Sequence, residues 1–152
     1  LALGDCGGGR MKREILFRGQ STDSKEWIEG EFSNLFSKAD ICLWTSDDGK
    51  SCLRYFPVKE ETVGEYIQRT DKHGTKVFEG DLVAITTKDD NGEENHDIFE
   101  VQYDDDDCRF VLFALNPRYQ DINPVFTQSF FSEHAEVIGN RWDMKIGVRH
   151  GK

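Results

Sequence analysis

The sequence has no long apolar run, and this absence limits where the protein can act. No stretch of about 18 apolar residues occurs, so no segment fits a transmembrane helix. Residues 1–10 have neither the basic start nor the apolar stretch of a secretory signal, and their glycines favour an unstructured leader or an expression remnant. We therefore expect Met11 to be the natural start of a cytoplasmic protein that has no membrane partner.

Residues that bind metals are few and are not spaced as ligands. The chain has four cysteines and four histidines, namely Cys6, Cys42, Cys52, Cys108, His73, His96, His134 and His150. They form no Cys-x-x-Cys or His-x-x-x-His pair, so we expect no metal site and reduced thiols. A disulfide between Cys42 and Cys52, across a hairpin, stays open as an alternative.

The motifs of common catalytic and cofactor sites are also missing. The sequence has no glycine-rich phosphate loop, no Gly-x-Ser-x-Gly elbow and no dinucleotide-binding fingerprint. Gly7 to Gly9 follow no predicted strand, so they do not form a phosphate loop. We expect no cofactor and find no constellation for nucleophilic catalysis.

Basic residues are scarce relative to acidic ones. The chain has 19 Lys and Arg against 29 Asp and Glu, which gives a formal net charge of −10. Such a field repels phosphate backbones, so direct binding of nucleic acid is not expected. A basic stripe would be needed to reverse this view, formed by Lys12, Arg13, Arg18, Lys145 and Arg149. The acidity favours solubility, although acidic hairpin tips that mimic nucleic acid and bind a basic host protein are a second interpretation.

The residues that are present alternate in short apolar runs separated by turn signals. Strand pairs are predicted at 14–17 with 27–32, 41–44 with 53–56, 62–67 with 77–78, and 82–85 with 98–103 followed by 110–113. Asp48-Gly49 favours a tight reversal because both residues tolerate positive φ, and Asn91-Gly92 favours a type I′ hairpin turn. The phenylalanines of 125–133 predict one or two helical turns. We expect one mainly β domain over 11–143, α+β at most, with a tail at 144–152. Its architecture would be a bent antiparallel sheet or a barrel-like arrangement of hairpins.

Two groups of acids are the conspicuous candidates for chemistry. Asp104, Asp105, Asp106 and Asp107 lack the glycine and the distant glutamate of a calcium loop, so a solvated hairpin tip that could contact a partner is favoured. Glu79-Gly80-Asp81 is interpreted as a structural corner. The alternative is that Glu79 and Asp81 form an acid/base pair with a distant histidine.

Three stretches resemble a known family. They are Met11-Lys-Arg-Glu-Ile-Leu-Phe-Arg with Trp27-Ile-Glu-Gly, Glu61-Thr-Val-Gly-Glu-Tyr leading into Asp71-Lys-His-Gly-Thr-Lys-Val-Phe-Glu-Gly-Asp-Leu-Val, and Glu136-Val-Ile-Gly-Asn. Together they are similar to the YopX family of small phage and prophage proteins. The chain departs from that pattern at Ile67 to Thr70 and at Arg141 to Asp143, which bears mainly on the C-terminal surface.

The resemblance implies a largely β fold, a phage or integrated-element origin, self-association as a homo-oligomer, and no catalytic residues to transfer. We therefore expect a non-enzymatic accessory protein in the cytoplasm of a bacterial host, binding a host or phage protein. The alternative is a small hydrolase or nucleotide-modifying enzyme with a carboxylate site at Glu79 and Asp81.

Overall fold

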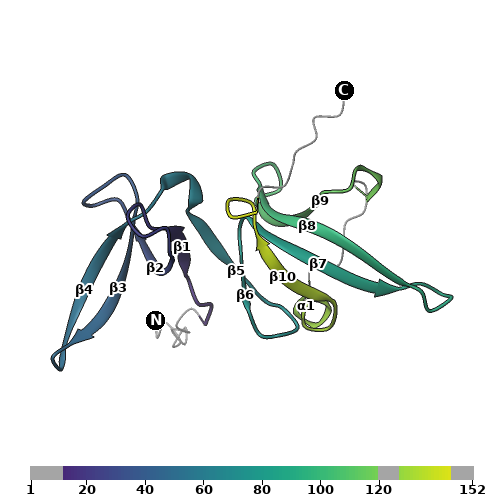
Figure 1. Cartoon of the computed structure of the whole chain (residues 1–152), viewed down its shortest axis with the longest axis horizontal. Helices are drawn as coiled ribbons and strands as arrows, with labels where there is room; N and C mark the ends of the chain where they lie inside the picture. The colour runs from purple at the N-terminus through teal and green to yellow at the C-terminus, as the bar shows by residue number, and fades with distance from the viewer. Residues whose placement is uncertain (1–11, 120–126, 145–152) are drawn as a thin grey trace, which may run out of the picture.

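The chain forms two antiparallel sheets and a short helix (Figure 1). A computed structural model describes residues 12–119 and 127–144. The first sheet has the order β4-β3-β2-β1-β5-β6 and the second β10-β7-β8-β9. The strands are β1 Phe17–Gln20, β2 Trp27–Ser33, β3 Asp40–Asp47, β4 Lys50–Pro57, β5 Gly64–Thr70, β6 Lys76–Phe78, β7 Asp81–Lys88, β8 Glu94–Asp104, β9 Arg109–Ala114 and β10 Ala135–Asn140.

The predicted fold class is confirmed. Strands joined by short reversals dominate, and neither sheet closes into a barrel within the described residues. One 3-10 turn, η1 Glu60–Thr62, connects β4 to β5, and a second, η2 Pro117–Tyr119, follows β9. No helix in the described part of the chain has the length and apolar character that crossing a membrane requires.

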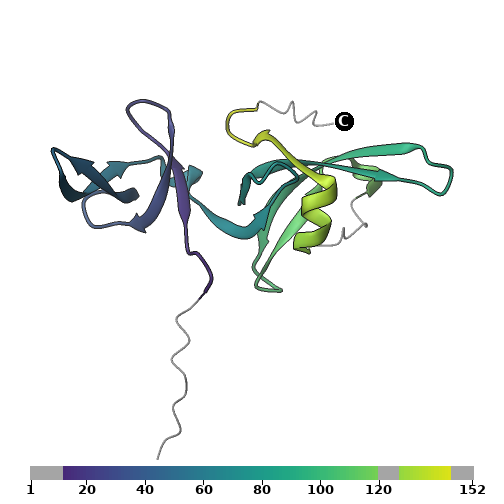
Figure 2. The same ribbon diagram turned by 90° about the horizontal axis from the view of Figure 1, so that it is seen from below.

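The predicted helix corresponds to α1, Gln128–His134; residues 125 and 126 lie outside the described residues. Thr127 caps its start, because its side-chain oxygen accepts a hydrogen bond from the Phe130 backbone N–H. Phe131 is fully buried, which contributes about 1.5 to 3 kcal/mol to folding. The helix contacts β5, β7 and β10, and Figure 2 shows it beside β10.

Two predicted reversals had different outcomes. Asp48 and Gly49 both have positive φ, 47° and 75°, as a type I′ turn between β3 and β4 requires. The type I′ prediction at Asn91-Gly92 is wrong, because only Gly92 has a positive φ there. The Asp89 carboxylate instead accepts hydrogen bonds from the backbone N–H groups of Asn91 and Glu93, which favours a wider loop.

The thiols of the β3–β4 hairpin are free. Cys42 lies opposite Tyr55, whereas Cys52 lies opposite Thr45. Side chains alternate between faces along a strand, so Cys42 and Cys52 point to opposite sides of the sheet. The structure therefore has no disulfide between them.

The apolar interior is divided unequally. The larger cluster of buried residues comprises Ile67, Val77, Val83, Ile85, Phe99, Val101, Leu112, Ala114, Phe131 and Ala135. It lies among the second sheet, β5, β6 and α1. The smaller cluster has Ala39, Ile41 and Val58 at its centre. Most of the buried apolar surface thus supports the second sheet, while the β3–β4 hairpin extends from a small core.

Candidate functional site

Asp81, one of the two predicted acid/base residues, is buried in an ion pair. Its side chain is 1% exposed, and its carboxylate accepts hydrogen bonds from the Arg18 guanidinium at 2.5 Å and from the Phe78 backbone N–H at 2.8 Å. Burial raises the pKa of the Asp81 carboxyl above its ordinary value, opposed by the charge of Arg18 and the Phe78 N–H. The Asp81 carboxylate therefore stabilises the corner between β6 and β7.

Arg18 connects the two sheets at this corner. Its guanidinium carbon lies 4.8 Å from the ring centroids of both Trp27 and Phe78. Such placement over aromatic rings suits the planar, weakly hydrated guanidinium. Arg18 therefore lies in the interior and is not available to the predicted basic stripe. Two other members of that stripe, Lys145 and Arg149, lie outside the described residues.

The turn after β10 closes over the corner. The Trp142 ring lies so near Gly80 that a Cβ atom there would be 2.3 Å from it. Asp143 accepts hydrogen bonds from the Trp27 indole N–H at 2.7 Å and from the Asn140 amide at 2.9 Å. Trp142 and Asp143 belong to the stretch at which the sequence departs from the pattern that it otherwise resembles, and this contact was not predicted from the sequence.

Glu79, the second predicted acid/base residue, faces a different environment from Asp81. It lines two adjoining hollows between the sheets, with volumes of about 300 and 220 Å³. We call them together the intersheet groove. The two hollows share three lining residues, namely Val63, Glu79 and Tyr103. The remaining lining residues are Phe17, Glu61, Gly64, Glu65, Gly80, Val101, Gln102, Phe110, Arg141 and Trp142.

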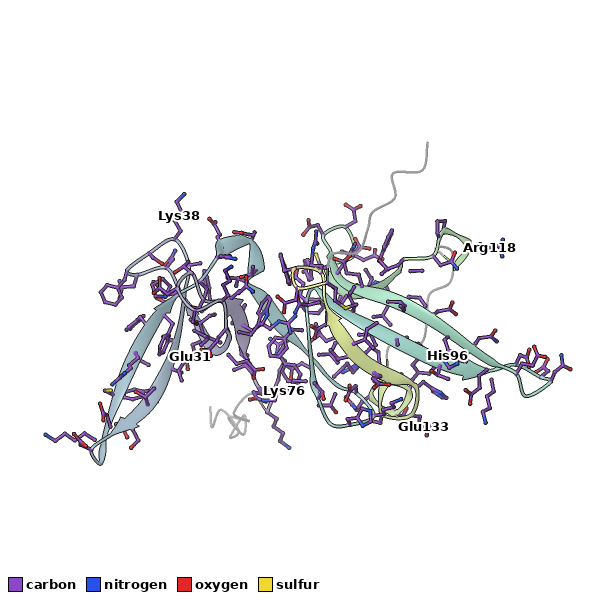
Figure 3. All side chains as sticks on the ribbon, viewed as in Figure 1. Glu31, Lys38, Lys76, His96, Arg118 and Glu133 are labelled. Atoms are coloured by element: carbon purple, nitrogen blue, oxygen red, sulfur yellow. The ribbon has the colours of Figure 1, made fainter. Side chains whose placement is uncertain are left out.

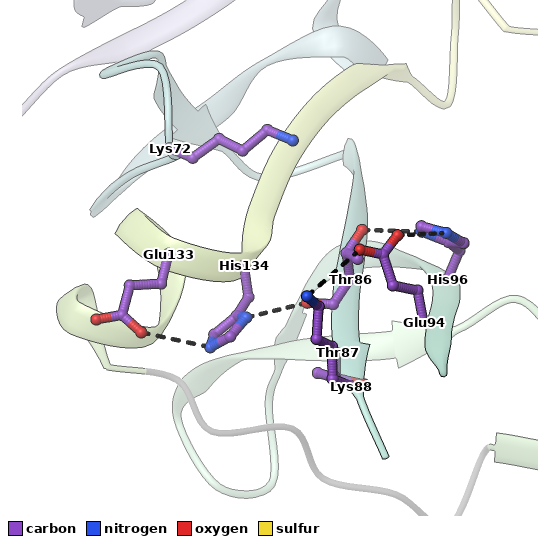
Figure 4. Close-up of a pocket in the computed structure, with 8 residues that line it drawn as sticks. All are labelled: Lys72, Thr86, Thr87, Lys88, Glu94, His96, Glu133 and His134. Carbon is purple, nitrogen blue, oxygen red and sulfur yellow. Dashed lines mark hydrogen bonds and ion pairs between the residues drawn. The ribbon is translucent and has the colours of Figure 1, made fainter. Parts of the chain in front are cut away.

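No histidine is among the described residues that line the intersheet groove. His96 and His134 instead line a larger pocket, of about 750 Å³, beside β7 and α1 (Figure 4). His73 lies 3.5 Å from Glu136. The alternative enzyme requires a histidine beside Glu79 and Asp81. The structure brings none of the described histidines there.

Two histidines of the larger pocket each lie beside a glutamate. The His134 Nδ1 lies 3.0 Å from the Thr86 carbonyl oxygen, and its Nε2 lies 3.5 Å from Glu133. His96 contacts the Thr86 hydroxyl and lies 3.6 Å from Glu94 (Figure 4). No group of three or more His, Cys, Asp or Glu side chains positioned for a metal ion occurs in the described residues.

The acidic run at 104–107 forms the predicted hairpin tip, between β8 and β9. The Asp104 carboxylate accepts hydrogen bonds from the backbone N–H groups of Asp106 and Asp107, and Asp105 to Asp107 are exposed. The other acidic tip, at 89–94, lies at the opposite end of β8. With a rise of about 3.3 Å per residue, the tips are on the order of 30 Å apart. They do not form one continuous row of charges.

An exposed apolar surface, which sequence reasoning missed, lies on the β3–β4 hairpin and the loop before it. Trp44 and Leu53 are directly opposed across the strands, so they share a face with the pair of Cys42 and Tyr55. The Phe36 ring packs edge-on against Tyr55, with centroids 4.7 Å apart. Phe36 is 71% exposed and Trp44 68%. We call this surface the hairpin patch: Leu35, Phe36, Trp44, Leu53 and Tyr55.

The hairpin patch and the histidine-lined pocket lie in opposite halves of the molecule. In Figure 3, Lys38 and Glu31 mark the half that carries the β3–β4 hairpin, and His96 and Glu133 mark the other half. The two surfaces are therefore separate candidates for contact with other molecules.

The comparisons with known proteins decide the family. The model of the protein family described as "YopX protein" matches residues 16–144 of this chain. The chain belongs to the YopX family. Among solved structures, the YopX-family chain is similar to protein EF1440 from Enterococcus faecalis, with 22% sequence identity and a TM-score of 0.51. The match covers 84% of this chain and 93% of that one, and supports the fold alone. No curated protein matches the sequence.

Proposed function

We propose that this YopX-family protein is an accessory protein of a phage or prophage that acts in the host cytoplasm by binding another protein, not by catalysis. The hairpin patch is the observation that carries the proposal. Three of its large apolar side chains, Leu35, Phe36 and Trp44, are each about 70% exposed, and they lose contact with water when a partner covers them. Aromatic residues of this kind are enriched at the centres of protein interfaces.

The edge of the first sheet supports the same surface. β4 is the last strand in the sheet order, so one of its sides pairs with no other strand among the described residues. Its free backbone N–H and C=O groups offer hydrogen bonds to an added strand. A partner can thus combine main-chain pairing along β4 with burial of Trp44 and Leu53. A second copy of the chain and a host or phage protein both meet this requirement.

The test compares two double variants of the full chain. Phe36→Ser/Trp44→Ser removes the centre of the hairpin patch. Ile98→Ser/Phe113→Ser removes two exposed apolar side chains from β8 and β9 and serves as the matched control. Partner binding is measured by quantitative capture from host lysate, and self-association by light scattering after gel filtration. Circular dichroism establishes that both variants fold.

We expect the first variant to bind at least about tenfold more weakly than the native chain, because aromatic anchors at an interface contribute about 2 kcal/mol or more. The control should bind as the native chain does. Equal retention by both variants would contradict the proposal, as would a native chain that is monomeric and captures no protein.

A further inference from the structure

Each hollow of the intersheet groove has the size of a site for one long side chain. The two hollows, of about 300 and 220 Å³, are at or below the lower limit for cofactor pockets. The walls come from β1 and β5 of the first sheet and from β8 and β9 of the second. Both sheets would therefore contact an inserted side chain.

The groove carries an excess of negative charge. Glu61, Glu65 and Glu79 line it, and the single described basic residue in the lining is Arg141. The Arg141 guanidinium is already engaged, because its Nη1 lies 3.0 Å from a carboxylate oxygen of Glu100. Three carboxylates thus line the groove with one cation, and that cation is also paired with Glu100.

Glu79 is the acid in the groove that most needs a counter-ion. No described Lys, Arg or His forms an ion pair with it. Burial raises the pKa of its carboxyl, and the charges of Glu65 and Asp105 act in the same direction, whereas a hydrogen bond with the Glu65 backbone and the charge of Arg141 oppose them. A positive charge placed beside Glu79 would offset this desolvation and repulsion.

Aromatic rings complete the groove. Tyr103 and Phe110 pack edge to face with centroids 5.2 Å apart, and Tyr103 is 44% exposed. A guanidinium stacks on such rings, whereas a lysine ammonium is more strongly hydrated and loses more on entering a half-buried slot. The chain already uses this chemistry at the neighbouring corner, where Arg18 lies against Trp27 and Phe78 and pairs with Asp81.

We propose that the intersheet groove binds an arginine side chain of a partner protein, with Glu79 and Glu65 as the anionic contacts and Tyr103 as the stacking surface. This site shares no residue with the hairpin patch and goes beyond the proposed function. Its occupant is identified by complementary charge and by the planar geometry that the rings favour.

The test is an NMR titration of the full chain labelled with nitrogen-15. The probe is the capped peptide Gly-Gly-Arg-Gly-Gly, and its control has citrulline, which keeps the planar shape without the charge. We expect saturable shifts of the Gly64, Glu79, Gly80 and Tyr103 amides with the arginine peptide. The citrulline peptide and the lysine analogue should each bind at least about fivefold more weakly.

A matched pair of variants separates the site from the general acidity of the chain. Glu79→Gln and Glu94→Gln remove the same charge, but Glu94 lies at the far end of β8 and outside the groove. Arginine binding should weaken at least about fivefold in Glu79→Gln and stay unchanged in Glu94→Gln.

Equal losses in the two variants, equal binding of the citrulline or lysine peptide, or no saturable shift at these amides would overturn the arginine site. Purified protein and short peptides are the sole components, so failure here is distinguishable from failure of the hairpin patch.

Discussion

At the scale of single residues, the pair of Arg18 and Asp81 is the contact whose disruption should cost the most. Asp81→Asn leaves the Arg18 charge uncompensated against two rings, so we expect a loss of about 3 to 5 kcal/mol in the free energy of unfolding. Asp47→Asn is the matched control, because it breaks the exposed pair of Asp47 with Arg54 and should cost less than about 1 kcal/mol. Urea unfolding measures both, and similar losses would contradict this role of the buried pair.

Asp71 makes the stability of the fold depend on pH in the acidic range. Its carboxylate accepts hydrogen bonds from the backbone N–H groups of His73, Thr75 and Val137, each at 2.9 Å. Burial alone raises the pKa of Asp71, but these hydrogen bonds outweigh it and hold the pKa below its ordinary value. The contribution to stability is therefore fully present above the unfolded pKa, and it is lost as the pH falls through the folded pKa.

We expect Asp71→Asn to lower the free energy of unfolding by about 1 to 3 kcal/mol at pH 7, because one backbone donor is left unpaired. The gap to the native chain should begin to narrow as the pH falls below the unfolded pKa of about 4, and it should close further as the pH falls through the lower pKa of the folded carboxyl. Urea unfolding at pH 7 and pH 3 checks this, with the exposed Asp90→Asn as control. A gap that is constant with pH would contradict the assignment.

At the scale of elements, alanine variants test whether close packing at Gly80, in the corner between β6 and β7, holds the two sheets together. Gly80 has φ of 84° and the Trp142 ring directly above it, whereas Gly49 has φ of 75° and open space. Gly49→Ala should cost on the order of 1 kcal/mol from backbone strain alone. Gly80→Ala should cost at least about 1 kcal/mol more, because Trp142 must also move. Urea unfolding followed by tryptophan fluorescence measures both, and equal costs would contradict the contact.

The strands could be predicted because their signals are local. The Asp48-Gly49 pair requires no distant partner to favour a reversal, and alternation along β3 and β4 indicates which residues share a face. The turn at Asn91-Gly92 was wrong because the Asp89 side chain competes for the same backbone N–H groups. The order of strands in the sheets depends on contacts across the chain, and no local pattern encodes it.

The candidate site was less predictable than the strands. The spacing of Glu79 and Asp81 suggested one acid/base pair. In the structure the two side chains lie in different environments, because the chain turns a corner between them. Asp81 pairs with Arg18, 63 residues away, and nothing in the sequence links them. The hairpin patch had a signal in the sequence that was not used. Strand β3 is apolar on both faces, with Cys42 and Trp44 on one face and Ile41 and Leu43 on the other. The smaller core covers one of these faces.

At the scale of the whole molecule, surface properties define how the protein can meet others. The net charge of −10 disfavours phosphate backbones, and the two acidic tips are separated by the length of β8. A homo-oligomer, a host partner and nucleic-acid mimicry stay predictions. The hairpin patch lies at the end of the molecule with the smaller core, where a partner would supply apolar burial that the fold itself lacks.

Photo-cross-linking in host cells tests the central claim most directly. A benzoylphenylalanine placed at position 44 lies in the hairpin patch, and the same residue at position 113 lies on β9 outside it. We predict a discrete cross-linked adduct with another protein, a second copy of the chain included, from position 44 and none from position 113. Adducts from position 113 alone, or from neither position, would contradict the hairpin patch as the binding surface.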